Sequence, residues 1–381
     1  MKKLFYFGLL GLGLLEILKV YFIMPMPGIS QQIESIDVAY FIHTYRWYFR
    51  IAFGIMILAG ATSAFRIKRS WLPMLPLLVV VVIVYYFNFK MTAEAIFHEP
   101  EKLAFHSKGE YLLGDTSLLI AVAYKGEAKA YPVRYIVYHH QVRDTVGGKP
   151  VMVTYCSVCR SGRVFEPVVN GKPENFRLVG MDHFNAMFED TSTKSWWRQA
   201  TGEAVAGPLK GSVLPEIESI QVSAGKFFLM YPFGVIMQAD QSSTRYYDSL
   251  ARFERGKGKS KLTGTDSLSW KEKSWVIGIQ IDNTSKAYDW NELKEKRIVN
   301  DKIGDVPIVL VLSEDNQSFA AFERPSESEI FSIQQDTLRS GNAVYDFAGK
   351  RLASEAESLK RINAYQEFWH SWRTFHPETE R

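Results

Sequence analysis

The stretch VMVTYCSVCRSGRVF, residues 151–165, holds the only two cysteines of the 381-residue chain. Two residues separate Cys156 from Cys159, and apolar, β-branched runs stand on both sides of the pair. This CxxC spacing predicts both sulfur atoms on one tight turn that follows a strand. Sulfur atoms placed in this way can close a small disulfide or bind a soft metal ion. The turn is therefore the first candidate for a functional site.

The surroundings of this turn recur in the chain at an offset of 157 residues. Without a gap, the register holds from Lys129 to Ala186 in the first copy. The identical pairs are Lys129 and Lys286, Ala130 and Ala287, Tyr131 and Tyr288, Val142 and Val299, Asp144 and Asp301, Gly147 and Gly304, Pro150 and Pro307, Phe165 and Phe322, Glu166 and Glu323, Asn185 and Asn342, and Ala186 and Ala343. One register kept over this distance indicates an internal duplication.

The pattern within each copy predicts an α+β, β-rich fold. Short apolar runs such as LLIAVAY, KPVMVTY, WVIGIQI and VPIVLVL are bounded by Gly, Asp and Pro, which is typical of strands joined by turns. Residues 132–140 and 289–296 predict single helices between strands. We expect two pseudo-equivalent halves, 90–240 and 274–381, with a connector at 241–273, packed against each other through a shared core.

The two halves differ at the turn itself. Where the first half has Cys156 and Cys159, the second has Ser313 and Asn316. The run SWWRQATGEAVAGPLKG of the first half also has no counterpart of equal length in the second. The sequence therefore predicts that only the first half carries chemistry.

The composition excludes several classes of protein. With 47% hydrophobic and 23% charged residues the chain is globular and not disordered. Its formal charge of +4 is small, and basic residues are mixed with acidic ones, so we expect no nucleic-acid partner. Two cysteines are too few for a disulfide scaffold.

Three apolar runs near the N-terminus predict a transmembrane anchor at residues 1–89. They cover about residues 4–23, 47–65 and 71–87, close to the ~20 residues that cross a bilayer as a helix. Within the first run, Glu16 and Lys19 are three residues apart and are expected to pair on one helical face. The external segment before the second run looks partly helical.

Basic residues set the expected orientation of this anchor. Lys2 and Lys3 precede the first run, and Arg66, Lys68 and Arg69 lie between the second and third. By the positive-inside rule these two places are cytoplasmic, which makes the rest of the chain extracytoplasmic. We expect a bacterial cytoplasmic (inner) membrane protein whose partners are the lipid bilayer and another membrane or periplasmic protein.

Several longer stretches together resemble the family known as domain of unknown function 3179, over about residues 99–380. They are GEAKAYPVRYIVYHHQVRDTVGGKPVMVTYCSVC, DTSTKSWWRQATGEAVAGPLKGSVL, KSWVIGIQIDNTSKAY and EFWHSWRTFHPET. The residues that fit the family pattern are Tyr155, Cys156, Cys159, Asp190, Thr193, Ser195, Trp197, Gln199, Gly202, Glu203 and Ala204. The resemblance implies membership and no particular activity, and it leaves the predicted anchor outside.

The chain departs from the family pattern at three positions. Ser157 and Val158 stand where Pro and Leu are usual, and His140 stands where a Glu commonly follows the histidine that corresponds to His139.

The first of three hypotheses for the turn is a copper or zinc site, because thiolates favour Cu(I) and Zn. Two sulfurs do not complete a metal shell. The expected further ligand is His183, with His139 and Met187 as weaker candidates and Met181 also near in sequence. A CxxC without a second CxxC or a spaced His pair is only a moderate zinc signal.

The second hypothesis is a periplasmic thiol–disulfide redox protein in which Cys156 and Cys159 are the reacting dithiol. Against it, the turn follows a strand, whereas activated cysteines commonly begin a helix; Arg160 could supply part of the missing positive charge. The third hypothesis is a non-catalytic binding or assembly module with a structural disulfide, although so small a loop gains little from a crosslink.

A polar cleft is predicted around the turn, lined by Asp182, His183 and the run from Trp197 to Glu203. Its pocket candidates are Asp182, Trp197, Arg198, Gln199 and Glu203. The chain lacks a Walker loop, a GxGxxG, a GxSxG elbow and an HExxH. Whether the protein is an enzyme stays open at this point.

Overall fold

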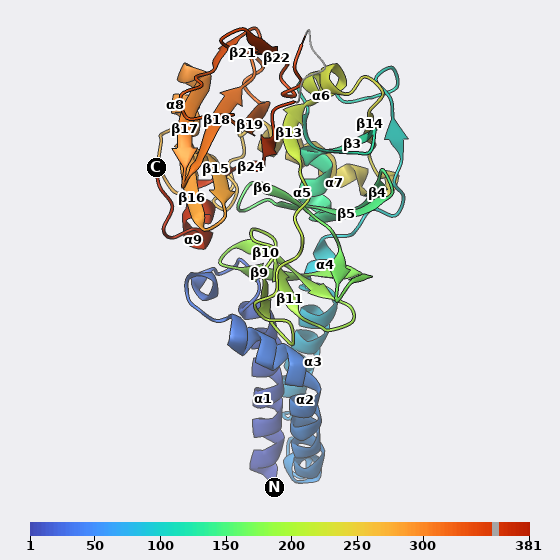
Figure 1. Cartoon of the computed structure of the whole chain (residues 1–381). Helices are drawn as coiled ribbons and strands as arrows, with labels where there is room; N and C mark the ends of the chain where they lie inside the picture. Colours follow the sequence, from blue (N-terminus) through green and yellow to red (C-terminus); the bar gives the residue numbers. More distant parts are fainter. Residues whose placement is uncertain (353–357) are drawn as a thin grey trace. The chain divides into compact units, whose positions relative to one another are not determined.

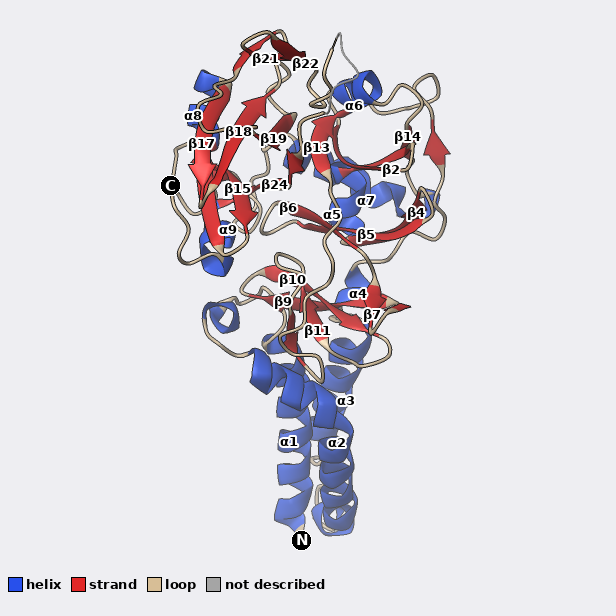
Figure 2. Ribbon diagram, in the orientation of Figure 1, coloured by secondary structure: helices blue, strands red, loops and turns tan. Residues whose placement is uncertain are grey.

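The structure is a computed structural model that describes residues 1–352 and 358–381, a mixed α+β protein (Figures 1 and 2). Its contacts group the chain into two compact units. The first unit comprises residues 1–98, 175–198 and 203–213. The second unit comprises residues 99–174, 199–202 and 214–381.

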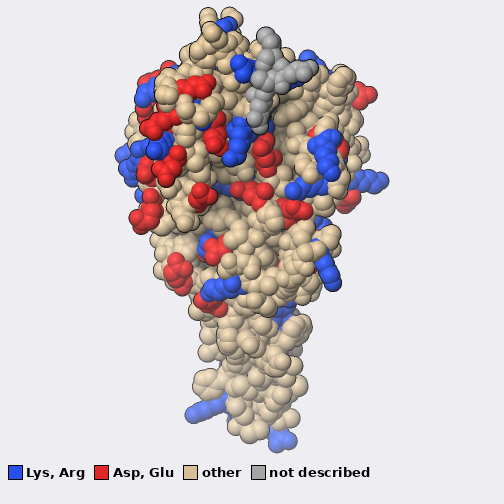
Figure 3. Space-filling model, in the orientation of Figure 1, with Lys and Arg blue, Asp and Glu red and all other residues tan. Residues whose placement is uncertain are grey.

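Three apolar helices run side by side in the first unit (Figure 1). They are α1 (Lys2–Tyr21), α2 (Ile36–Phe65) and α3 (Met74–Phe89). By length and composition α1 and α2 are long and apolar enough to cross a membrane, and α3, with 16 residues, is shorter. The face shown in Figure 3 carries Lys and Arg at one end of these helices and almost no charge along their length. The N-terminal third of α2 is the partly helical segment that the sequence predicts.

A buried polar network joins the three helices. The carboxylate of Glu16 on α1 is fully buried and lies 2.9 Å from the Lys19 ammonium, which confirms the predicted pair. It also accepts hydrogen bonds from Arg50 on α2 at 2.6 and 2.9 Å and from Asn88 on α3 at 2.8 Å. A buried carboxylate is stable only when it is paired and hydrogen-bonded, so this network fixes how the helices pack.

The remainder of the first unit is a small antiparallel sheet with the strand order β12-β11-β10-β9. Its strands are β9 (Phe176–Asp182), β10 (Asn185–Asp190), β11 (Trp196–Arg198) and β12 (Ala204–Ala206), and the short helices η1 (Ile29–Gln32) and α4 (Ala93–Ile96) complete the unit. Ile23 and Ala39 from the helical part share one buried cluster with Val179, Met187 and Trp196 of the sheet. The sheet and the helices therefore have a common core.

The second unit begins with a five-stranded sheet of order β1-β14-β3-β2-β13 and a three-stranded sheet of order β4-β5-β6. Their strands are β1 (Phe105–His106), β2 (Leu118–Tyr124), β3 (Glu127–Pro132), β4 (Gln141–Val146), β5 (Lys149–Cys156), β6 (Ser161–Phe165), β13 (Ile220–Ser223) and β14 (Val235–Met237). The hairpin β7 (Val168–Val169) and β8 (Lys172–Pro173) and the helices α5 (Val133–His139), α6 (Ala224–Met230), η2 (Gln241–Ser243) and α7 (Thr244–Glu254) accompany them.

The C-terminal part of the second unit contains three further sheets, of orders β16-β15-β24, β17-β18-β19-β23 and β20-β21-β22. Their strands are β15 (Trp275–Ile281), β16 (Thr284–Asp289), β17 (Ile298–Ile303), β18 (Val306–Leu312), β19 (Phe319–Glu323), β20 (Ser332–Gln334), β21 (Thr337–Ser340), β22 (Ala343–Tyr345), β23 (Arg361–Ile362) and β24 (Ala364–Phe368). The helices here are α8 (Trp290–Lys296) and α9 (Trp369–Phe375).

Elements of the two halves begin at positions that differ by the offset of 157 residues. This holds for β2 and β15, β3 and β16, α5 and α8, β4 and β17, and β5 and β18. Both helices end at a residue with positive φ, 61° at His140 and 65° at Arg297. The Tyr131 hydroxyl donates to Asp144 at 2.8 Å, and the Tyr288 hydroxyl donates to Asp301 at 2.9 Å.

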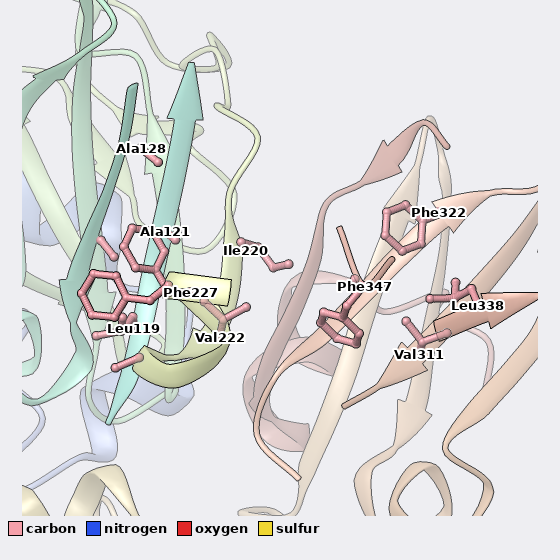
Figure 4. Packing of buried hydrophobic residues seen from close by; sticks show 14 of the residues in the cluster. Leu119, Ala121, Ala128, Ile220, Val222, Phe227, Val311, Phe322, Leu338 and Phe347 are labelled. Atoms are coloured by element: carbon pink, nitrogen blue, oxygen red, sulfur yellow. The ribbon is translucent and has the colours of Figure 1, made fainter. Parts of the chain in front are cut away.

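One buried cluster takes side chains from both halves, as the sequence predicts. Figure 4 shows Leu119, Ile220 and Val222 on one side and Val311 and Phe347 on the other. The halves also share hydrogen bonds: the Ser223 N–H donates to the Ser318 hydroxyl at 2.8 Å, and Gln221 donates to Gln366 at 3.1 Å.

The contacts also group some segments differently from the ranges expected for the halves. The sequence places 175–198 and 203–213 in the first half, whereas their contacts group them with the helices of the first unit. The segment 241–273, expected as a connector, contains α7. The carboxylate of Glu254, the last residue of α7, accepts hydrogen bonds from the Leu118 N–H at 2.8 Å and from Arg134 at 2.9 Å.

Candidate functional site

The two cysteines lie at a four-residue turn between neighbouring antiparallel strands. Cys156 is the last residue of β5 and pairs with Ser161, the first residue of β6. Arg160 closes the turn with a φ of 57°. Both sulfurs are buried, and no disulfide joins them. The backbone N–H of Cys159 points to the Cys156 sulfur at 3.4 Å.

A lysine and a histidine from distant parts of the second unit cover this turn. Lys273 Nζ donates to the Val158 carbonyl at 3.1 Å, and His370 Nε2 lies 3.2 Å from the same oxygen. The two side chains are 3.1 Å apart, and the Phe368 N–H donates to the Cys159 carbonyl at 2.9 Å. Lys273 and His370 are half-buried, so the two side chains that contact the Val158 carbonyl of the turn also reach solvent.

The electrostatics of this lysine involve both sulfurs. Burial lowers the pKa of Lys273, and interaction with the sulfurs of Cys159 and Cys156 opposes that shift. Burial, together with the charge of Lys273, lowers the pKa of His370 to about 3, so the imidazole is neutral at physiological pH. A retained positive charge beside a sulfur stabilises its thiolate form.

Two buried arginines hold the strands on either side of the turn. Arg160 donates to the carbonyls of Phe253 and Glu254 at 2.7 and 2.8 Å and stacks on the Trp275 ring at 4.1 Å. Its charge is therefore directed at α7 and away from the role of thiol activator that the sequence suggested. Arg163 on β6 donates to Glu367 at 2.7 Å, and both side chains are buried.

Among the predicted pocket residues, Gln199 contacts the strands of the turn. Its amide oxygen accepts from the Ser161 hydroxyl at 3.0 Å, and its amide nitrogen donates to the Ser161 carbonyl at 3.1 Å and to the Thr154 hydroxyl at 3.2 Å. Gln199 is fully buried, which makes it a support of the turn.

Other predicted site residues form a separate cluster in the first unit. His183 Nδ1 lies 2.7 Å from the Asp182 carboxylate, whose other oxygen accepts from Arg198 at 2.6 Å. Arg198 also lies 3.5 Å from Glu203, and His183 Nε2 lies 3.5 Å from Glu34. This cluster is an ion network centred on one buried carboxylate.

The pKa values within this network follow from its geometry. The hydrogen bond to Asp182 raises the pKa of His183. Burial would raise the pKa of Asp182, but the hydrogen bonds from His183 and Arg198 outweigh it and lower that pKa. His183 and Phe184 form the two-residue turn between β9 and β10 with φ values of 49° and 64°, as type I′ hairpin turns require.

The remaining residues predicted for the site take part in hydrogen bonds or in core packing. The Trp197 ring N–H donates to Asp190 at 2.9 Å, and His139 Nε2 lies 2.6 Å from the Tyr247 hydroxyl. Met187 is buried in the core of the first unit, and Met181 is buried as well. Across residues 1–352 and 358–381, no group of three or more His, Cys, Asp or Glu side chains is placed to hold a metal ion. The predicted copper or zinc site thus gains no third ligand of these types from the described residues.

Sequence reasoning missed Lys273 and His370. Both residues lie in stretches that carry the family resemblance, KSWVIGIQ and EFWHSWRTFHPET. That resemblance is the one feature of the sequence that could have pointed to them. Nothing in the spacing places them beside the cysteines, because the contact depends on how residues more than a hundred positions apart fold together.

Comparison with known proteins gives one match. Neither the curated proteins nor the solved structures gave a match to the chain. The family model described as "Protein of unknown function (DUF3179)" matches residues 98–379, which is most of the chain. The chain therefore belongs to that family.

Proposed function

We propose that the protein is a membrane-anchored thiol–disulfide redox protein whose reacting dithiol is Cys156 and Cys159. The observation that carries the proposal is the position of Lys273, whose ammonium group interacts with both sulfurs and is hydrogen-bonded to the turn between them. A cation held beside two reduced thiols favours their thiolate forms, which are the nucleophiles of disulfide exchange. The described residues supply no third His, Cys, Asp or Glu ligand for a metal beside them.

The reaction that follows is a two-electron exchange. The thiolate of one cysteine attacks a disulfide of a partner, which releases one partner thiolate and leaves a mixed disulfide. The second cysteine then attacks the mixed disulfide and releases the other partner thiolate. Cys156 and Cys159 end as a disulfide, the partner gains two electrons and two protons, and the reverse reaction oxidises a partner dithiol.

The N–H of Cys159 supports Cys156 as the first nucleophile. It is directed at the Cys156 sulfur at 3.4 Å and would stabilise negative charge there. Both sulfurs are buried, so exchange with a partner requires the turn to open outward. The contacts that such opening breaks are those of Lys273 and His370 with the Val158 carbonyl.

We infer an anchor of three spans with both basic ends in the cytoplasm and the family domain outside the cell membrane. The basic ends are Lys2 and Lys3 before α1 and Arg66, Lys68 and Arg69 before α3. The apolar character of α1 and α2 and the polar network that joins both to α3 support this arrangement. Disulfides form and persist in extracytoplasmic compartments, which suits disulfide exchange by the CxxC there.

We further propose that the two halves of the domain arose by duplication. The equal offset of five pairs of elements supports this, as do the matching Tyr–Asp hydrogen bonds. In the second half the turn has Ser313 and Asn316 and is braced by Asp315, whose carboxylate accepts from the N–H groups of Gln317 and Ser318. Lys273 donates to the first turn at Val158, and Arg297 donates to the second turn at Asn316.

The experiment compares the full chain with the Cys156→Ser, Cys159→Ser double variant. Both are extracted without chelators, assayed for bound metal, equilibrated with oxidised or reduced glutathione, then quenched in acid and alkylated. The proposal expects no stoichiometric metal and a loss of two alkylatable thiols on oxidation, in the unmodified chain only. Stoichiometric copper or zinc that the double variant lacks would establish the metal site instead, and thiols unchanged by oxidation would leave a binding or assembly module.

A further inference from the structure

A cavity of about 530 Å³ lies within the first unit, between one end of the apolar helices and the small sheet. α1 contributes Lys19, α2 contributes His43 and Arg46, β9 contributes Arg177, and Lys194 follows β10. Cavities of this volume are in the range that holds a small molecule or a headgroup. The cysteines are not part of it.

The polar lining of this cavity is predominantly basic. Lys19, Arg46, Arg177 and Lys194 stand against two carboxylates, Glu94 and Glu189. Arg177 is paired with Glu189 at 2.8 Å and with Glu94 at 3.4 Å, and Lys19 is paired with Glu16. In the described part of the chain, no carboxylate lies within 4.0 Å of the charged groups of Arg46 or Lys194. Arg46 donates one guanidinium N–H to the His43 carbonyl one turn earlier on α2, so its charge, like that of Lys194, is not neutralised by a direct ion pair within the described residues.

The lining is also amphipathic. Val20, Ile23 and Met24 from the end of α1 and Met91 after α3 supply apolar surface beside the basic groups. A small inorganic anion in the cavity would leave this apolar surface exposed to water. A ligand that carries both an anionic group and a hydrocarbon part satisfies both kinds of lining.

Exposed aromatic side chains stand at the same level of the helices as the cavity. Trp47 and Tyr48 directly follow Arg46 on α2, and Tyr85, Tyr86 and Phe89 lie near the end of α3 that leads to Met91. Exposed Trp and Tyr at the ends of apolar helices are typical of the boundary between hydrocarbon and water. The cavity thus lies where the headgroups of a bilayer would be.

We propose that this cavity binds the headgroup of an anionic phospholipid, with the phosphate between Arg46 and Lys194 and the acyl chains leaving along the apolar helices. The inference rests on the membrane anchoring proposed above and is independent of the dithiol. Its chemistry is that of basic pockets that recognise anionic headgroups at the ends of membrane helices.

The test uses the full chain in nanodiscs of phosphatidylcholine to which phosphatidylglycerol is added, with bound lipid counted by native mass spectrometry. The cavity variant is Arg46→Gln, Lys194→Gln. The matched control is Lys90→Gln, which removes an exposed charge at the same end of α3 outside the cavity lining. A parallel arm replaces the lipid with water-soluble glycerol phosphate.

We expect one phosphatidylglycerol per chain, an affinity at least tenfold lower in the cavity variant, and a change of less than twofold in the control. Equal losses in the cavity and control variants, or no preference for phosphatidylglycerol, would overturn the proposal and leave the anchoring intact. Glycerol phosphate bound as tightly as the lipid, with the same dependence on Arg46 and Lys194, would overturn the lipid as occupant. A chain that does not enter nanodiscs would refute the anchoring as well.

Discussion

Lys273 is the residue on which the redox account depends most. Its ammonium group stabilises the reduced, thiolate form of the dithiol more than the disulfide, because only the thiolate carries negative charge. A dithiol whose reduced form is stabilised is the stronger oxidant, so under the proposed redox function we expect this lysine to raise the reduction potential of the pair.

The first prediction follows for Lys273→Met. Loss of the charge should lower the reduction potential of Cys156 and Cys159 by about 30 mV or more, which corresponds to ~1.4 kcal/mol for two electrons. Equilibration with glutathione buffers and acid-quenched alkylation measures the shift. Lys271→Met, an exposed charge two residues away, is the control and should leave the potential unchanged. A potential that falls equally in both variants would contradict a specific role for Lys273.

The second prediction concerns the pH dependence of the His183 network. Because the pKa of His183 is raised on folding, its contribution to stability is present below its ordinary pKa and is lost as pH rises through the raised value. Asp182→Asn should bring the His183 pKa back toward 6.5 in a ring-proton NMR titration. Glu34→Gln, which removes a neighbour at 3.5 Å, should have a smaller effect. An unchanged titration in Asp182→Asn would show that this carboxylate is not the cause.

For single residues, the sequence identifies which side chains could carry chemistry better than it identifies the side chains that they contact. The CxxC is visible from spacing alone, whereas Lys273 reaches the turn from the segment before β15 and His370 reaches it from α9. His183 was expected beside the sulfurs because it is near in sequence, yet its contacts are with Asp182 and Glu34. Nearness in sequence cannot decide which of two compact units a hairpin joins.

Among the elements, the two corresponding turns provide an internal comparison. The turn of the second half lies between the corresponding strands β18 and β19 and lacks the sulfurs. Arg297 donates to its Asn316, and its Ser313 donates to Asp336, each at 2.7 Å.

The third prediction moves the cysteines to that turn. Ser313→Cys, Asn316→Cys and Arg297→Gln in the background of Cys156→Ser, Cys159→Ser should give a dithiol with a more negative reduction potential than the native pair. Arg297→Gln removes the guanidinium that donates to Asn316 at 2.7 Å, and the Asp336 carboxylate, which accepts from Ser313 at 2.7 Å, disfavours a thiolate at position 313. The same glutathione titration measures it. A potential equal to that of the native pair would mean that the turn alone sets the chemistry.

The first and last residues of a strand could be predicted where an apolar run and the turn residues around it indicate the same bounds. β2, β15 and β18 coincide with the runs LLIAVAY, WVIGIQI and VPIVLVL, because polar or turn-forming residues follow each run, beginning at Lys125, Asp282 and Ser313. α7 was hidden in a polar segment, and its place depends on contacts such as those of Glu254 with Arg134 and Leu118. Such an element is stabilised by tertiary contacts and has little signal in local sequence.

For the whole molecule, the helical N-terminus is part of a folded core. Residues 98–379 match the family, but the sheet β9–β12 within that range buries Val179, Met187 and Trp196 against Ile23 and Ala39. The pattern of apolar runs predicted the helices as an anchor and could not show this packing.

The fourth prediction tests that shared core. A chain that begins at His98 should expose the sheet face and unfold at a lower temperature or aggregate, because each large apolar side chain that loses its burial costs about 1.5–3 kcal/mol. Thermal unfolding in the same detergent as the full chain measures it. An unchanged melting temperature would show that the helices serve only as an anchor.

The reduction potential of the full chain tests the central claim most directly. Samples equilibrated over a series of glutathione ratios, quenched in acid and alkylated, report the fraction of Cys156 and Cys159 present as disulfide. The account predicts one cooperative two-electron transition at a potential above about −300 mV, the value below which structural disulfides are typically found. Thiols that stay reduced across the whole series, or a disulfide that no physiological ratio reduces, would contradict it.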